Sequence, residues 1–136
     1  MSLVRNILTD RANVSQWDKT FSKRELIQSF PEENGASKSY YHNTIKFPAF
    51  MSDRDVVVEE KIWPQHNNDP KSLLISSFST TLSKCPAQEK LVRAEILAGG
   101  LYAYETSPQQ TTITRINNID LKVPTGADFV NAKLPK

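Results

Sequence analysis

Two adjacent glutamates follow a run of three valines and are the residues of this sequence best suited to chemistry. In the stretch DVVVEEKIW, residues 55–63, Glu59 and Glu60 interrupt an otherwise apolar strand pattern. A carboxylate in an apolar pocket can orient a ligand, or act as a general base if burial raises its pKa toward neutrality. Burial of an unpaired carboxylate is costly, so we expect a charged partner, a cavity with water, or a position at the wet end of the strand.

Other residues that could carry chemistry are scattered. His42 and His66 lie far apart, without a cysteine or carboxylate cluster at metal-ligand spacing, so we expect no metal site. Cys85 is the only cysteine and has no neighbouring histidine, which favours a free surface thiol over a nucleophile. There is no glycine-rich phosphate loop and no G-x-S-x-G or H-E-x-x-H motif, and we expect no cofactor.

Strand periodicity decides which glutamate turns inward. Successive side chains of a strand point to opposite faces, so inward Val56 and Val58 would bring Glu60 and Ile62 to the same side. The opposite parity would bury Val57 together with Glu59. Either arrangement draws one carboxylate to the apolar side. We take the first as the working prediction, with Val56, Val58, Glu60 and Ile62 facing a cavity.

These residues require a sheet, and the sequence predicts one. Six segments rich in β-branched and aromatic residues are separated by proline and short polar turns, and all neighbouring strands are predicted to be antiparallel. A short helix is expected around Val4, Ile7 and Leu8, and ADFVNAKLPK near the end could form a helix with Phe129 on its apolar face. Gly99 and Gly100 predict a bend, with packing favoured over ligand contact as its cause. The predicted strands are 25–30, 39–47, 55–63, 72–81, 91–105 and 111–119.

Composition limits the class of protein. A chain of 136 residues with 38% hydrophobic and 24% charged residues suits one soluble domain, residues 1–136. The first nine residues lack the features of a secretory signal, and the single cysteine fits a reducing compartment, so we expect a cytoplasmic protein. A net charge of +2 from dispersed basic residues does not indicate nucleic-acid binding.

Several motifs resemble the StAR-related lipid-transfer (START) domain family. In FPAFMSDRDVVVEEKIW, Met51, Ser52, Arg54 and Asp55 match the family's proline turn and Met/Val-Ser-x-Arg-Asp pattern. SQWDK is similar to the end of the family's Trp-Asp helix, while VRAEILAGGLYAYE and TTITRINNIDLKVP resemble its last two strands. The four matches occur in the family's order across nearly the whole chain.

The resemblance implies an α+β helix-grip fold, in which a curved antiparallel sheet wraps a C-terminal helix and encloses one lipid. It implies binding and transfer or sensing of a phospholipid or sterol, with transient membrane contact and no catalysis. Arg54 and Asp55 would form a structural charge cluster, and Phe129 would contact the ligand with the four strand residues. Glu60 stands where sterol-binding members tend to place a basic residue.

The chain also departs from the family pattern. It begins close to the Trp-Asp helix, without the preceding helix and three strands, and it includes only the start of the closing helix. The last strand would then have an open edge that a second copy or a neighbouring domain could cover. Two alternatives to lipid binding follow: an interaction domain that uses this edge, and, less favoured, a polyketide cyclase-type enzyme with Glu60 as general base.

Overall fold

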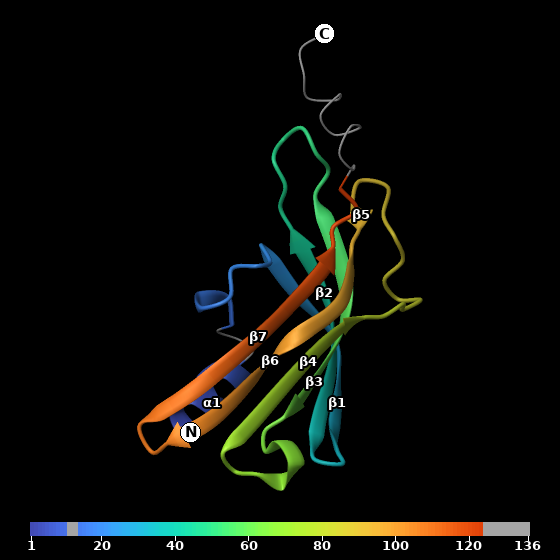
Figure 1. Ribbon diagram of the computed structural model, residues 1–136. Coiled ribbons are helices and arrows are strands. Elements are labelled where there is room, and N and C mark those ends of the chain that lie inside the picture. Colours follow the sequence, from blue (N-terminus) through green and yellow to red (C-terminus); the bar gives the residue numbers. More distant parts are fainter. Residues whose placement is uncertain (11–13, 124–136) are drawn as a thin grey trace.

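The computed structural model describes residues 1–10 and 14–123 and has α+β architecture. Figure 1 shows a strongly twisted, curved sheet with one helix against one of its faces. The predicted C-terminal helix, including Phe129, lies outside the described residues. The elements are α1 (Ser2–Thr9), β1 (Lys23–Glu33), β2 (Ala36–Ile45), β3 (Arg54–Trp63), β4 (Ser72–Ser79), β5 (Val92–Arg93), β6 (Glu95–Ser107) and β7 (Gln110–Asp120), with 3-10 turns at Val14–Gln16 and His66–Asn68.

The antiparallel meander predicted from the sequence is confirmed. The strands follow the order β1-β2-β3-β4-β6-β7, which leaves β1 and β7 at the two edges of the described sheet. The predicted strand 91–105 is wrong in one respect, because it is divided at Ala94. Its first part, β5, pairs in parallel with the start of β3, so the prediction of purely antiparallel neighbours is also wrong there. The chain passes beside the start of β3 before β6 pairs with β4, so Val92 and Arg93 can form a parallel pair with Arg54 and Asp55.

The first hairpin differs from the prediction in where its first strand ends. Pro31 was expected to end the first strand, but β1 continues to Glu33. Pro31 is tolerated because β1 is an edge strand and a register shift between Phe30 and Glu33 removes it from the ladder. Asn34 and Gly35 then turn the chain, both with positive φ, as a tight two-residue hairpin requires.

The sheet has two chemically different faces. The inner face carries Val56, Val58 and Ile62 and contacts α1, whereas the outer face carries Val57 and alternate residues. On the inner face, Leu8 of α1 packs with four sheet residues, and Met1, Val4, Trp17 and Ile62 surround that cluster. A second inner-face cluster joins Val56, Val58 and Ile96 to Phe21 and Ile119. The four sheet residues that pack with Leu8 are Leu73, Ile75, Leu101 and Ala103.

Helix α1 is fixed to the sheet at both its apolar and its polar side. Leu8 is buried on the inner face, and Arg5 donates to the carbonyls of Pro64 (2.8 Å) and Pro70 (2.6 Å) in the connection between β3 and β4. Ile7, predicted to belong to the same apolar pattern, remains 50% exposed. None of the helices in the described part of the chain is long and apolar enough to cross a membrane.

Gly99 and Gly100 allow β6 to approach β4 closely. A Cβ on Gly100 would collide with the carbonyl oxygen of Ile75, and its φ of 150° disfavours other residues. The register shift of β6 near this point falls between Ile96 and Ala98. The two glycines therefore permit close contact between β4 and β6, and they leave space on the inner face beside Ser77.

Candidate functional site

The inner face contains a hollow with a volume of about 70 Å³, which we call the inner hollow. It lies beneath the segment from residue 14 to residue 22, which we call the strap. The apolar side chains of its lining are Trp17, Phe21, Val58, Ile75, Ile96, Leu101 and Ile116. Three adjacent strands contribute polar side chains to it: Arg24 from β1, Asn43 from β2 and Glu60 from β3. The other polar residues of the lining are Asp18 and Thr20 of the strap, Ser77 of β4, and Arg115 and Asn117 of β7.

The predicted cavity residues separate in the structure. Val58 and Glu60 line the inner hollow. Val56 is 0% exposed and is packed against Val58 and Ile96, so it supports the wall from behind. Ile62 lies further along β3 and packs in the cluster around α1. The strand parity chosen from the sequence places all four on one face, although only two of them reach the hollow.

Glu60 is buried beside a basic partner. Its side chain is 7% exposed, and its Oε2 lies 3.5 Å from Nη2 of Arg24. Arg24 also lies over the ring of Tyr41, 4.7 Å from the ring centroid, which places a cation on an aromatic face. Of the three arrangements considered for Glu60, the charged partner is the one observed. The opposite charges of Glu60 and Arg24 leave the polar side of the hollow close to neutral.

Two buried polar atoms at this spot lack a hydrogen-bond partner among the described residues. They are Nε of Arg24 and Oδ1 of Asn43. Arg24 and Asn43 are directly opposite each other in the ladder between β1 and β2, and Asn43 is 2% exposed. A buried donor or acceptor without a partner is destabilising, so such groups in native proteins call for an explanation.

The strap is tied to the opposite edge of the sheet. Asp18 accepts a hydrogen bond from Arg115 of β7 at 2.9 Å, and the same guanidinium donates to Thr20 at 3.0 Å. Burial of Asp18 favours its neutral form, but hydrogen bonds from Thr20 and Arg115 outweigh this and lower the pKa of the carboxyl. The ionised carboxylate therefore connects β7 to the strap beside the inner hollow.

Arg54 and Asp55 bind different partners at the start of β3. Arg54, 3% exposed, donates to the carbonyls of Ser52, Leu121 and Lys122, and its guanidinium lies 4.5 Å from the centroid of the Phe47 ring. It thereby fixes the chain where β7 ends. Neither residue lines the inner hollow, and they act on opposite faces of the strand.

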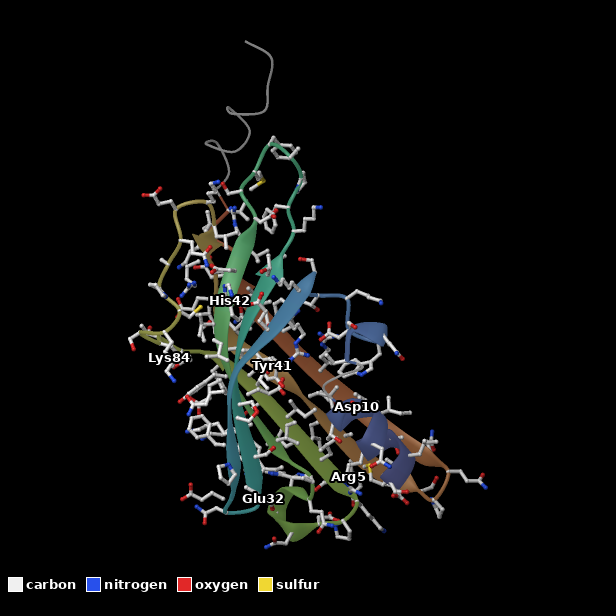
Figure 2. The ribbon with its side chains drawn as sticks, turned by 180° about the vertical axis from the view of Figure 1, so that it is seen from behind. Arg5, Asp10, Glu32, Tyr41, His42 and Lys84 are labelled. Atoms are coloured by element: carbon white, nitrogen blue, oxygen red, sulfur yellow. The ribbon has the colours of Figure 1, made fainter. Side chains whose placement is uncertain are left out.

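Asp55 organises a polar cluster on the outer face. Arg93 donates to its two oxygens at 3.0 and 3.2 Å, and Nε2 of His42 lies 2.8 Å from Oδ2. Figure 2 labels His42 and Tyr41, which are consecutive residues of β2. Because successive side chains of a strand point to opposite faces, His42 lies on the face opposite to Tyr41. Burial of Asp55 opposes ionisation, but the hydrogen bonds from Arg93 and His42 prevail and lower its pKa. Arg93 also donates to the carbonyls of Cys85 and Pro86, which holds the preceding loop in place.

Sequence reasoning missed the partners of these carboxylates. Arg24 and Asn43 lie on strands distant in sequence from Glu60, and their contact depends on the register of two ladders. The available signal was weak: Arg24 and Leu26 alternate at the start of β1, which places an arginine on the apolar side. Within residues 1–10 and 14–123, no group of three or more His, Cys, Asp or Glu side chains could hold a metal ion.

Comparison with known proteins gives one family and several similar structures. The START domain family model matches residues 1–131. No curated protein sequence matches the chain. Human STARD10 superposes with a TM-score of 0.71 and 23% identity over 97% of this chain and 50% of its own.

Two further human structures are similar. The lipid transfer and protein localization domain of StarD13 (DLC2) gives a TM-score of 0.67 and 20% identity over 91% of this chain and 58% of its own. StAR-related lipid transfer protein 5 gives a TM-score of 0.68 and 17% identity over 88% of this chain and 55% of its own. The chain thus spans about half the length of these structures.

Proposed function

Since this chain belongs to the START domain family, we propose that it binds one lipid on the inner face of its sheet and transfers or senses that lipid without catalysis. The observation that carries the proposal is the inner hollow, whose lining combines apolar side chains with polar ones, of which Asn43 and Glu60 are buried. Small-molecule sites commonly have this composition, because apolar contacts supply affinity and polar groups fix orientation. Two of the similar structures are themselves described as lipid transfer proteins or domains.

The size of the inner hollow defines what the proposal requires. At about 70 Å³ it holds a polar end group and not a whole lipid, since ligand pockets commonly measure about 300–1,000 Å³. Movement of the strap away from β7 would extend the hollow along the inner face. In the proposed complex, the polar end of the lipid occupies the hollow and its apolar body takes the place of the displaced strap.

The same geometry supports a binding role over general-base catalysis. A general base must be placed to accept the proton of a reacting group, whereas Oε2 of Glu60 lies 3.5 Å from Nη2 of Arg24 and is engaged by that side chain. We therefore propose that Glu60 fixes the position of Arg24 and that neither acts on the ligand chemically. The proposed setting is the cytoplasm, with membrane contact only while lipid is exchanged, and residues 1–136 act as one unit.

Filling the inner hollow tests the lipid-binding proposal. Ser77 of β4 lines the hollow, while the preceding residue, Ser76, points to the outer face, so Ser77→Phe and Ser76→Phe form a matched pair. Native mass spectrometry followed by lipid extraction should find one lipid per wild-type chain and per Ser76→Phe chain. Lipid recovery from Ser77→Phe should fall by about tenfold, because the new ring occupies the space for the end group.

Three results count against this function. They are absence of any lipid from the wild-type protein, retention of lipid by a folded Ser77→Phe variant, and equal loss from both variants. Circular dichroism of each variant establishes whether it is folded before lipid is measured.

A further inference from the structure

A cleft also lies on the outer face of the sheet, at the tip of the β1–β2 hairpin, and we call it the hairpin cleft. Its volume is about 610 Å³, which falls within the range of about 300–1,000 Å³ that is common for small-molecule pockets. Figure 2 labels Glu32 at this tip, away from the loop that carries Lys84. The lining includes two aromatic residues, two lysines and two glutamates, namely Phe30, Trp63, Lys38, Lys61, Glu32 and Glu33.

The two lysines of the hairpin cleft face each other across two strands. Lys38 of β2 and Lys61 of β3 are direct partners in the antiparallel ladder. Their Cβ atoms are therefore about 5 Å apart on one face, an arrangement that is destabilising for like charges. Lys61 lies 3.6 Å from Glu59, whereas Lys38 has no ion pair with any carboxylate of residues 1–10 and 14–123. The opposed lysines indicate a site for a negative charge.

Aromatic rings hold the ammonium group of Lys38 in place. Its Nζ lies 4.4 Å from the ring centroid of Phe30 and 5.6 Å from that of Tyr40, and these two rings meet edge to face at 5.2 Å. A cation thus already occupies their faces, which disfavours a cationic ligand at this spot. Trp63 follows Lys61 by two residues on the same face, and its ring has no aromatic or cationic partner in the described part of the chain.

We propose that the hairpin cleft binds an organic anion with a flat aromatic body. The anionic group lies between the ammonium groups of Lys38 and Lys61 and offsets their repulsion, while the flat body stacks on Trp63. A lysine ammonium binds phosphate, sulfate or carboxylate oxygens as a point charge, so an anionic oxygen group is the shared chemistry. Glu32 and Glu33 line the hairpin end of the cleft, which restricts the anionic group to the lysine end.

Four small probes separate the contribution of charge from that of shape. They are naphthalene-2-sulfonate, the neutral naphthalene-2-sulfonamide, 2-naphthyltrimethylammonium and methanesulfonate, each titrated into the full chain by isothermal titration calorimetry. We expect the naphthalene sulfonate to bind about tenfold more tightly than the sulfonamide, because only the sulfonate accepts charge-assisted hydrogen bonds with its own negative charge. Methanesulfonate lacks the ring and should bind more weakly. Amide shifts in ¹H–¹⁵N NMR spectra should cluster in residues 30–38 and 61–63.

The variant Lys38→Met tests the role of the lysine pair. Methionine keeps an unbranched apolar stem that can pack on Phe30 but carries no charge. Binding of the naphthalene sulfonate should therefore weaken by about tenfold, while binding of the sulfonamide stays the same. Lys61→Met should have the same selective effect. Lys84→Met removes an exposed charge outside the hairpin cleft and should change neither affinity. The NMR spectrum of each variant establishes that it is folded before the titration.

The outcomes decide this proposal separately from lipid binding. Equal affinity for the sulfonate and the sulfonamide, tighter binding of the trimethylammonium probe, or no saturable binding would overturn it. Equal weakening by Lys38→Met and Lys84→Met would also overturn it, since the effect would then come from net charge. The described linings of the hairpin cleft and the inner hollow share no residue, so each of these results leaves the inner-face function in place.

Discussion

Asp55 illustrates how one buried charge can depend on residues from three separate segments. Its carboxylate is 0% exposed and is stabilised by Arg93 and His42, and Arg93 in turn holds the carbonyls of Cys85 and Pro86. Breaking a buried ion pair by removing one partner leaves the other charge uncompensated. The motif Arg54-Asp55 was expected to be structural, and its contacts give each residue a distinct set of partners.

We predict that Asp55→Asn lowers the free energy of unfolding at neutral pH by about 3 kcal/mol. The pKa of Asp55 is lowered in the folded state, so its contribution is present above the pKa of the unfolded chain and is lost as pH falls through the folded pKa. Urea unfolding across this pH range should therefore show the two proteins converging in acid. Asp120→Asn, which removes an exposed partner of Lys122, should have a smaller effect. A constant difference down to the lowest pH would contradict this account.

Residue types in the sequence predicted the burial of Glu60 but not its surroundings. Alternation along β3 placed one glutamate on the apolar side. Because burial of an unpaired carboxylate costs free energy, the sequence also predicted a partner or a cavity for it. The identity of Arg24 and Asn43 depends on the register shift between Leu26 and Gln28, which no local pattern reveals. This is why the sequence predicted a buried carboxylate but not the polar side chains beside it.

At the level of elements, turn chemistry was the most reliable signal. Proline and polar turns located each of the six long strands, because these residues restrict or permit specific backbone angles. The exceptions have tertiary causes. Pro31 is accommodated at an edge, and β5 forms because Val92 and Arg93 lie beside Arg54 and Asp55, which local periodicity cannot indicate.

Gly100 gives the sharpest test of how β4 and β6 are held together. We predict that Gly100→Ala lowers the free energy of unfolding by about 3 kcal/mol or more, since the new methyl group would meet the Ile75 carbonyl and φ is 150°. Gly35→Ala is the control, because its φ is also positive, at 79°, but nothing lies within 4 Å of the added Cβ. Its cost should be about 1 kcal/mol, as backbone strain alone predicts. Equal midpoints for the two variants in urea would show that close strand approach is not what Gly100 provides.

Within the part of the chain that the structure describes, the sheet has two open edges, and those edges are not alike. Edge β1 carries charged residues and Pro31, features that discourage pairing with another chain. Edge β7 is eleven residues long, contains neither proline nor glycine, and has only Arg115 and Asp120 as charges. Ile113 and Ile116 on this strand are 50% and 59% exposed. Strand β7 is therefore the edge at which we expect association.

We predict that the purified chain self-associates through antiparallel pairing of β7 strands. A two-fold axis through Ile116 would place Ile113 opposite Ile119 and would keep the inner faces of both sheets on one side. Ile116→Lys should weaken this association by about tenfold, because a lysine on the edge disfavours strand addition. Phe78→Lys removes an apolar side chain of similar exposure, 50%, from the interior strand β4. This control distinguishes pairing at the β7 edge from non-specific hydrophobic association. Sedimentation equilibrium over a range of concentrations measures both. A monomer at all concentrations, or equal weakening of association by the two lysine variants, would contradict pairing at β7. Either result would also remove the interaction-domain alternative. Recovery of lipid from a monomeric protein would leave the inner face as its functional surface.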